Sequence, residues 1–409
     1  MAANGAARLL VLGAGPAQLG ILGAARRRGL TVVAADRDAL APGFRLADRR
    51  AVVSIEDEPA IERLARAEEV DGIVAAGTDH AVGIAARIAF RLGLPHPVAP
   101  EAAQLAVSKQ RQRERLAEAG VPQPRSIVCR SPEEVLAAAD ELGYPCVIEA
   151  PNRLGERGVG LAPDRGAVEA AAAEALAEWQ GDYCLVEELV GGRLVTVDGF
   201  SVGGRLVALT VTDREGAPAP AFGVTLAQLW PADLDDEDTG AVVALAAAGA
   251  GALGIDDGPT TTQVLLGSDG PLVAKVSARL GGGHDAELCR AALGVDLNDL
   301  AVSSALGEPV GLERLAPLHR VGGAVVRFLV APPGELREVV GADEATEIDG
   351  VEWVRVYREP GHRFEPLRRA SDRAGAVLAT GSSLGAAGAA ASEAAGLVRF
   401  VVDPVEAVV

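Results

Sequence analysis

The sequence predicts a fold of mixed α/β and α+β class, with three parts over residues 1–100, 101–310 and 311–409. In the first part, short apolar runs alternate with helical patterns, which is typical of a parallel sheet with crossover helices. In the second, hairpin-like strands are interleaved with helices, and in the third, strands predominate before a closing alanine-rich helix. A chain of 409 residues exceeds the size of one hydrophobic core, so two or three domains are expected.

The first part is predicted to be an α/β domain. Its strands are expected at Arg8–Gly13, Thr31–Ala35, Arg50–Ser54 and Gly72–Ala76, and its helices at Ala17–Arg28, Glu58–Glu68 and Ala81–Leu92. The first strand-to-helix turn carries Gly13, Gly15 and Gly20, but a dinucleotide-binding G-x-G-x-x-G turn would need glycine at Gln18. The spacing argues against such a site and favours a tight turn that lets the helix pack on the sheet.

The second part is predicted to hold two lobes, and the third a β-rich subdomain. A helix is expected over Glu101–Ala119, followed by strands at Tyr144–Ala150 and Tyr183–Glu188 around a helix at Val168–Trp179. The second lobe would contain two hairpins, Leu194–Ser201 with Arg205–Thr212 and Pro259–Leu266 with Pro271–Val276, and helices at Thr239–Leu253 and Gly283–Ala292. From Arg320 the chain is strand-rich, and a helix over Leu384–Leu397 closes it.

Composition narrows the class of partner. The net charge of −19 argues against nucleic acid and anionic membranes, whose phosphates would be repelled. The four cysteines are widely spaced without a C-x-x-C pair, which favours buried thiols in a reducing compartment over a disulfide frame or zinc site. No signal peptide or membrane-spanning run is evident in the sequence, so a soluble cytoplasmic protein is expected.

Lysine is rare in this chain and therefore informative. Of the 38 lysines and arginines only two are lysines, Lys109 and Lys275. A lysine supplies a compact charge on a flexible stem, and burial can shift its pKa, which arginine does not offer. Both lysines fall in segments that we expect to line one pocket, although two incidental surface lysines would also fit the count.

Seven segments, in order, resemble the ATP-grasp superfamily, in its branch of ATP-dependent carboxylate–amine ligases related to carbamoyl-phosphate synthetase and amino-acid ligases. They are AAGTDHA (Ala75–Ala81), SKQRQRERLAEAGVPQPR (Ser108–Arg125), YPCVIEAP (Tyr144–Pro151), VEELVGG (Val186–Gly192), GPTTTQV (Gly258–Val264), VSARLGGGHDAEL (Val276–Leu288) and RAGAVLATG (Arg373–Gly381). Each is weak alone, but their order on the expected strands and helices predicts this fold. The resemblance implies two α+β lobes that hold ATP between them, and by itself it implies no activity.

Some of the residues that the resemblance implies as nucleotide contacts are retained in this sequence. Lys109 matches the first family lysine, and Arg279 matches an arginine that faces the phosphates. Glu187 and Glu188 match the acidic pair on the strand that receives adenine. The glycine loop over the phosphates corresponds to residues 155–160, with glycines at Gly155, Gly158 and Gly160.

Five other contacts are replaced. The second lysine position holds Glu149 and the ribose carboxylate position Leu194, while the magnesium positions hold Gln263, Lys275 and Ser277. Magnesium takes oxygen ligands, and an ammonium repels it. Near triphosphate oxygens at ~4 Å, with an effective dielectric of about 20, a lysine-to-glutamate change swings the interaction by ~8 kcal/mol before relaxation. The sequence therefore predicts a degenerate nucleotide site, with no metal site and no cofactor expected.

The reversed charges at Glu149 and Lys275 allow three interpretations. They could pair with each other and hold a disabled site together. In a repurposed pocket, Lys275 would be a base, electrophile or carboxylate anchor, with Glu149 as its acid–base partner. The third is an intact but unusual nucleotide site. His284, after the glycines of residues 281–283, is a candidate proton carrier near neutral pH or merely a helix-start residue.

Three functions follow. The favoured one is an ATP-grasp-fold protein that has lost ordinary Mg·ATP-dependent ligation, its pocket serving another small, carboxylate-bearing molecule or an ATP-independent reaction in secondary metabolism. The first alternative is an active ATP-dependent carboxylate–amine ligase, using ATP and Mg, with compensating residues. The second is a noncatalytic binding or partner subunit. A homodimer is left open.

Overall fold

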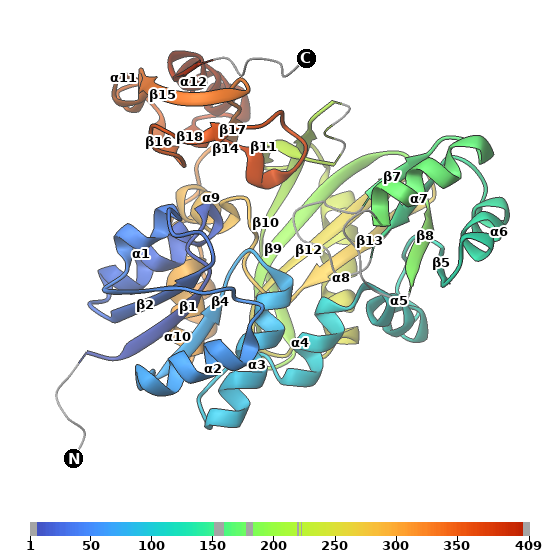
Figure 1. The fold of residues 1–409 in the computed structure, drawn as a ribbon, viewed down its shortest axis with the longest axis horizontal. Helices are drawn as coiled ribbons and strands as arrows, with labels where there is room; N and C mark the ends of the chain where they lie inside the picture. Colours follow the sequence, from blue (N-terminus) through green and yellow to red (C-terminus); the bar gives the residue numbers. More distant parts are fainter. Residues whose placement is uncertain (1–5, 151–158, 177–182, 219–220, 222, 404–409) are drawn as a thin grey trace.

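A computed structural model describes residues 6–150, 159–176, 183–218, 221 and 223–403, which form four sheets (Figure 1). The N-terminal sheet is parallel, with strand order β3-β2-β1-β4. Its strands are β1 (Arg8–Leu12), β2 (Thr31–Asp36), β3 (Arg49–Val52) and β4 (Gly72–Ala75), and its helices are α1 (Leu19–Arg27), α2 (Glu58–Ala67) and α3 (Asp79–Leu92). This is the predicted parallel-sheet unit, with boundaries shifted by a few residues.

The glycine turn after β1 is filled by the protein's own side chains. Gly13 has φ +97°, and a Cβ there would lie 2.9 Å from the Gln18 side chain, whose Nε2 donates to the Ala76 carbonyl at 2.5 Å. The Ala14 amide donates to Asp36 Oδ2 at 2.8 Å. The turn therefore needs glycine for close packing, as the sequence indicated.

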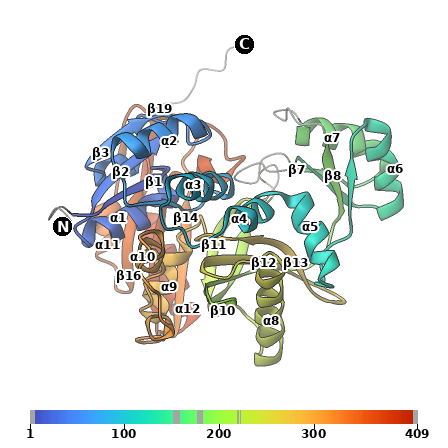
Figure 2. The same cartoon turned by 90° about the horizontal axis from the view of Figure 1, so that it is seen from below.

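The linker to the first lobe is two helices, α4 (Pro100–Val107) and α5 (Lys109–Glu118), where the sequence predicted one. Ser108 breaks the run because it adopts an extended conformation and its hydroxyl accepts from the Arg111 amide at 3.4 Å, which caps α5. Figure 2 shows the first lobe standing to one side of the molecule, reached through α4 and α5.

The first lobe is an antiparallel sheet covered by two helices. Its strand order is β5-β8-β6-β7, and α6 and α7 pack on it around a core that includes Cys129, Cys146 and Cys184. The elements are β5 (Ser126–Cys129), α6 (Pro132–Leu142), β6 (Cys146–Glu149), β7 (Val159–Ala162), α7 (Val168–Leu176) and β8 (Cys184–Glu188). All four cysteines of the chain are buried free thiols, as predicted.

The second lobe and the C-terminal strands share one eight-stranded sheet, with order β13-β12-β9-β10-β11-β14-β18-β16. The second lobe supplies β9 (Arg193–Val202), β10 (Arg205–Gly216), β11 (Thr225–Trp230), α8 (Asp236–Ala252), β12 (Gly258–Gly267), β13 (Gly270–Ser277), α9 (Asp285–Leu293) and α10 (Leu297–Ala305). The C-terminal part adds β14 (Gly323–Leu329), β16 (Val351–Val356) and β18 (Gly375–Gly381).

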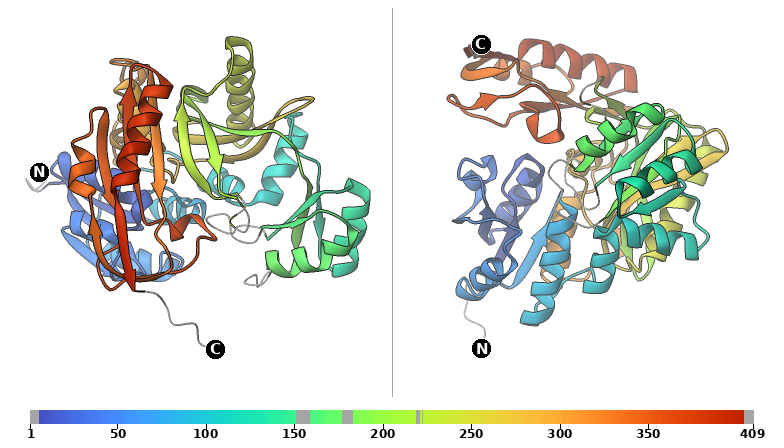
Figure 3. Two further views of the ribbon diagram at one scale, coloured as in Figure 1. Left: turned by 90° about the horizontal axis from the view of Figure 1, so that it is seen from above. Right: turned by 45° about the vertical axis from the view of Figure 1, so that its right-hand side comes forward.

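The C-terminal part also carries a small sheet of its own, with order β17-β15-β19. The strands of this small sheet are β15 (Gly334–Val340), β17 (Arg363–Phe364) and β19 (Arg399–Asp403). The helices of the C-terminal part are α11 (Ala342–Thr346) and α12 (Leu384–Leu397). The helix over 384–397 is where the sequence placed it, but β19 follows it. Figure 3, right, shows this part in red above the blue N-terminal sheet.

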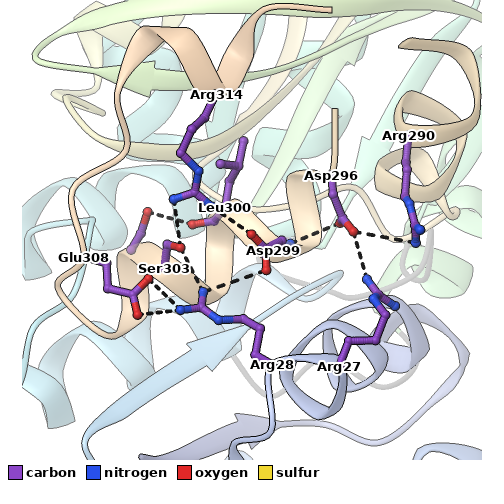
Figure 4. Close-up of polar contacts among 10 residues, drawn as sticks. Arg27, Arg28, Arg290, Asp296, Asp299, Leu300, Ser303, Glu308 and Arg314 are labelled. Atoms are coloured by element: carbon purple, nitrogen blue, oxygen red, sulfur yellow. Dashed lines mark hydrogen bonds and ion pairs between the residues drawn. The ribbon is translucent and has the colours of Figure 1, made fainter. Parts of the chain in front are cut away.

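An ion-pair cluster fixes the N-terminal domain to the second lobe. Arg28, just after α1, donates to Glu308 and Ser303, while Arg27 at the end of α1 contacts Asp296 at 2.8 Å, just before α10 (Figure 4). Arg314 reaches the same helix from the following segment (Figure 4). A single buried cluster also joins β1 and α1 to α9, α10 and β14. The relative position of the parallel sheet and the second lobe is therefore set by both apolar packing and charge.

Across the described residues, no helix is both long and apolar enough to cross a membrane.

Candidate active site

One face of the large sheet is polar and carries the positions at which the resemblance implied metal ligands. The register pairs Gln263 with Lys275 and Thr261 with Ser277 between β12 and β13, and Thr261 with Asp198 between β12 and β9. Directly opposed residues on adjacent strands point to the same face. The alternate residues of these strands, Val195, Val197, Val264 and Val276, are buried in the core against α8. The alternation thus separates a core face from a face available for chemistry.

Lys275 contacts the N-terminal domain through Asp79, the first residue of α3. Its Nζ lies 2.6 Å from Asp79 Oδ2, and Arg279 donates to the same carboxylate through Nε at 2.7 Å and Nη2 at 3.1 Å. Burial alone would raise the pKa of Asp79, but Arg279 and Lys275 together hold that pKa well below its usual range. Two cations share one ionised carboxylate, so this group carries a net positive charge.

Lys109 lies in a second network, between the first lobe and α5. It contacts Glu149 at the end of β6 and Glu187 on β8, the latter at 2.7 Å. Arg113, one turn further along α5, donates to Glu187 at 2.7 Å and to the carbonyls of Val273 and Ala274. Burial opposes ionisation of both Glu187 and Lys109. The two cations nevertheless lower the pKa of Glu187, and the two carboxylates raise the pKa of Lys109. Two cations meet two carboxylates, so this network is close to neutral.

The possible mutual ion pair between Glu149 and Lys275 is wrong for this structure. Glu149 pairs with Lys109, and Lys275 pairs with Asp79. The physical reason is that each lysine finds a carboxylate on a nearer element. Glu149 therefore does not stand as the acid–base partner of Lys275.

His284 begins α9 in a left-handed conformation, with φ +65°, and is 3% exposed. Its Nε2 lies 2.5 Å from the Tyr357 hydroxyl and its Nδ1 3.2 Å from Glu287 Oε1, an oxygen that also accepts from Arg355 at 2.6 Å. Burial opposes ionisation of Glu287, but His284 and Arg355 lower its pKa. His284 is thus held by side chains, Glu287 from α9 and Tyr357 from just after β16, and not by backbone as a simple helix-start residue would be.

Asp198 is a buried acid on the polar face. Thr261 Oγ1 lies 2.6 Å from Asp198 Oδ1 and 3.1 Å from the Arg279 carbonyl, and one hydroxyl hydrogen serves only one acceptor. A protonated Asp198 that donates to Thr261 resolves this conflict. Burial and the nearby charge of Asp285, which Arg214 contacts at 2.7 Å, raise the pKa of Asp198 to about 8.

The other predicted nucleotide contacts have varied surroundings. Glu188 accepts from the Arg125 amide and guanidinium on the opposite side of β8 from Lys109, and Leu194 lies half-buried in β9. Gly160 lies in β7, where a Cβ would come within 2.1 Å of the Ala171 carbonyl oxygen, so close packing on α7 accounts for this glycine. Gly155 and Gly158 lie outside the described residues.

The donor set at the implied metal positions does not fit magnesium. Gln263 offers one amide oxygen and Ser277 one hydroxyl, while the Lys275 ammonium has three donors and no acceptor. Within the described ranges, no cluster of three or more His, Cys, Asp or Glu side chains is arranged to hold a metal ion.

Comparison with known proteins supports the fold and the family. Residues 108–197 match the model described as the carbamoyl-phosphate synthase L chain ATP-binding domain, and residues 327–403 match the L-amino acid ligase C-terminal domain 2. A formate-dependent phosphoribosylglycinamide formyltransferase from Thioalkalivibrio sulfidiphilus is 30% identical over 417 residues, covering 97% of both chains. The chain belongs to the ATP-grasp superfamily of carboxylate–amine ligases.

Two further comparisons cover most of this ATP-grasp chain. Protein y4rH of Sinorhizobium fredii is 29% identical over 355 residues, or 84% of this chain and 70% of the relative. The crystal structure of L-amino acid ligase from Bacillus licheniformis superimposes with a TM-score of 0.82 at 22% identity, covering 97% of this chain and 99% of that one. At that identity the structural likeness shows the ATP-grasp fold alone.

Sequence reasoning missed the partners of the residues that it identified. Asp79 lies within the AAGTDHA segment, and Arg113 lies one helical turn after Lys109. Both residues are therefore part of segments that carry the family resemblance, and both were predictable as partners. Asp198 could have been noticed as a lone acid in an apolar strand. Glu287, three residues after His284 in the segment VSARLGGGHDAEL, could also have been noticed. Arg355 and Tyr357 carried no signal, because their contact with His284 depends on how β16 and the segment after it pack against α9.

Proposed function

We propose that this ATP-grasp protein is an active carboxylate–amine ligase, in which ATP drives the joining of a small carboxylate to an amine. The observation that supports this most is similarity along 97% of the chain to a relative whose name describes such an activity, formate-dependent phosphoribosylglycinamide formyltransferase. The chain also retains cations at or next to the positions that the resemblance implies, namely Lys109 and Arg113 on α5, Lys275 on β13 and Arg279 after it.

The compensating residues belong to the chain itself. Lys275 and Arg279 put positive charge on the polar face of the sheet, where ligand phosphates or carboxylates would otherwise need a metal ion to screen them. Asp198, protonated at neutral pH and lying on the same face, can hold and release a proton at its carboxyl oxygen. We propose that the substrate is a small carboxylate-bearing molecule. We also propose that the protein forms a homodimer and acts in the cytoplasm.

A specific observation favours a second candidate. Lys109 is enclosed by two carboxylates, so little of its charge is left for a triphosphate. If the Lys109 network excludes ATP, the fold would serve an ATP-independent reaction or the binding of another small anion, as the sequence favoured.

A product screen separates these candidates. The protein is incubated with ATP and mixtures of small carboxylates and amines, and phosphorus NMR follows the nucleotide while mass spectrometry detects condensed products. Product with matching ADP or AMP supports the ligase. Unchanged ATP, together with binding of a carboxylate from the mixture, supports the repurposed pocket instead.

A further inference from the structure

The two charge networks at the implied nucleotide positions differ in their balance of charge. Among the described residues, the Lys109 network pairs two cations with two carboxylates, whereas Lys275 and Arg279 share the one carboxylate of Asp79. We propose that Lys275, braced by Asp79 and assisted by Arg279, binds an anionic group of the ligand directly, a phosphate or a carboxylate, without a divalent cation. This inference rests on the proposed function, which places the ligand's phosphates or carboxylates over the polar face of the sheet. It adds which side chain binds the ligand's negative charge.

The surroundings of Lys275 leave it able to bind. Its side chain is 33% exposed, whereas that of Asp79 is 10% exposed and that of Arg279 13%. Among the described residues, Asp79 is the one ion-pair partner that Lys275 has, and that contact uses one of three ammonium hydrogens. The remaining hydrogens are available to an anion over the polar face.

Asp79 fixes the ammonium in place. A lysine side chain loses considerable rotamer freedom when it is held, so a partner that positions it before the ligand arrives improves binding. Asp79 is itself oriented by the two-point contact with Arg279, and it stays ionised at neutral pH because its pKa is held low. The carboxylate that holds the ammonium is therefore ionised at neutral pH.

The same charge makes the position unsuitable for a metal ion. The ammonium stands in register with Gln263, on the strand pair that also places Ser277, so a divalent ion among these three would meet a fixed positive charge. An anion at this point would bind to the Lys275 ammonium beside the contact that Asp79 already makes between the N-terminal domain and the second lobe.

The test is calorimetric titration of the full chain with inorganic tripolyphosphate and, separately, with succinate, in EDTA and in magnesium. We expect at least one probe to bind in EDTA, with an affinity that magnesium changes by no more than about twofold. Binding of tripolyphosphate identifies a phosphate as the group held, and binding of succinate alone identifies a carboxylate.

Three variants make the test specific to Lys275. Lys275→Gln should weaken the binding about tenfold or more, and Lys275→Arg should retain most of it, because only the first removes the charge. Arg49→Gln removes one positive charge from exposed β3 and should change nothing. Thermal unfolding checks that each variant is folded; Arg279 still partners Asp79 in Lys275→Gln.

Two results would overturn the inference: binding that strengthens more than about tenfold with magnesium, or binding that Lys275→Gln leaves unchanged. Failure of both probes to bind in either condition would overturn it as well. These outcomes are distinct from failure of the proposed function. A protein that binds tripolyphosphate in EDTA yet forms no product contradicts the ligase alone, and one that forms product only with magnesium contradicts this inference alone.

Discussion

Asp79 Oδ2 lies 2.6 Å from Lys275 Nζ, so the first residue of α3 in the N-terminal domain holds the ammonium at one implied metal position of the second lobe. The contact joins two elements almost two hundred residues apart in sequence. It gives the rare lysine at position 275 a carboxylate partner. The charge on the polar face of the sheet therefore depends on how the N-terminal domain packs against the second lobe.

Replacing Asp79 with asparagine should destabilise the protein by about 3 kcal/mol at pH 7, because Lys275 and Arg279 would then share a partly buried site without a carboxylate. The native pKa of Asp79 lies below its ordinary value of 3.8, so this stabilisation is complete above that pH and is lost as the pH falls further. Urea unfolding at pH 7 measures the loss. Glu338→Gln, at an exposed carboxylate, is the control and should unfold like the wild type.

Glu149→Gln should tighten ATP binding about tenfold, because Lys109 would lose one of the two carboxylates that neutralise it. Glu188→Gln is the matched control, since Glu188 accepts from Arg125 on the other side of the strand. Equal ATP affinity in wild type and Glu149→Gln would show that Lys109 does not reach the nucleotide.

Combining Glu149→Lys with Lys275→Glu should weaken ATP binding in EDTA, because it removes the ammonium that meets the phosphates, and should make the remaining binding magnesium-dependent. The double change returns both positions to the charges that the ATP-grasp resemblance implies, and a carboxylate at position 275 can ligate magnesium where an ammonium cannot. Titration with ATP in EDTA and in magnesium measures this. Unchanged binding in EDTA by a folded double variant would mean that residue 275 lies away from the phosphates.

The buried Asp198 predicts a pH-dependent stability. Its folded pKa of about 8 exceeds the ordinary value of 3.8, so folding takes up a proton, and stability falls as pH rises between these two values. Relative to Asp198→Asn, the wild type should lose about 1 kcal/mol per pH unit between pH 5 and pH 7. Urea unfolding over this range is the measurement, and parallel curves for the two proteins would refute a raised pKa.

Gly160→Ala should destabilise the first lobe by about 2 kcal/mol, since the new Cβ would meet the Ala171 backbone at 2.1 Å. Gly388→Ala, in α12, places its Cβ in open space and should stabilise by about 0.5 kcal/mol through helix propensity. Thermal melts of the two variants compare them directly. Equal melting temperatures would show that β7 yields to relieve the contact.

The fold class was predictable from the sequence, because local patterns indicate each sheet. The alternation of strands and helices over residues 8–92 is one such pattern. The sequence also placed Gln263 and Lys275 at one site. Their pairing was not predictable from the hairpin turn, which alone would put Ala274 opposite Gln263; a bulge between Gln263 and Val264 brings Lys275 there instead. The break at Ser108 was missed because a serine within a helical pattern serves equally as an interior residue or a cap.

The ion pairs were not predictable in the same way. Choosing Glu149 or Asp79 as the partner of Lys275 requires the position of α3 against β13, which depends on packing between domains and not on spacing along the chain. The joining of β14 to β11, which makes one sheet of two predicted units, is likewise a contact over about a hundred residues without a local signal.

Isothermal titration of the purified chain with ATP, in EDTA and again with magnesium, tests the account most directly. Binding of ATP with closely similar affinity in both conditions is the predicted result, because Lys275 and Arg279 already supply the charge that meets the phosphates. Tight binding that appears only with magnesium would contradict it, and so would the absence of heat in both conditions, which would point to the repurposed pocket.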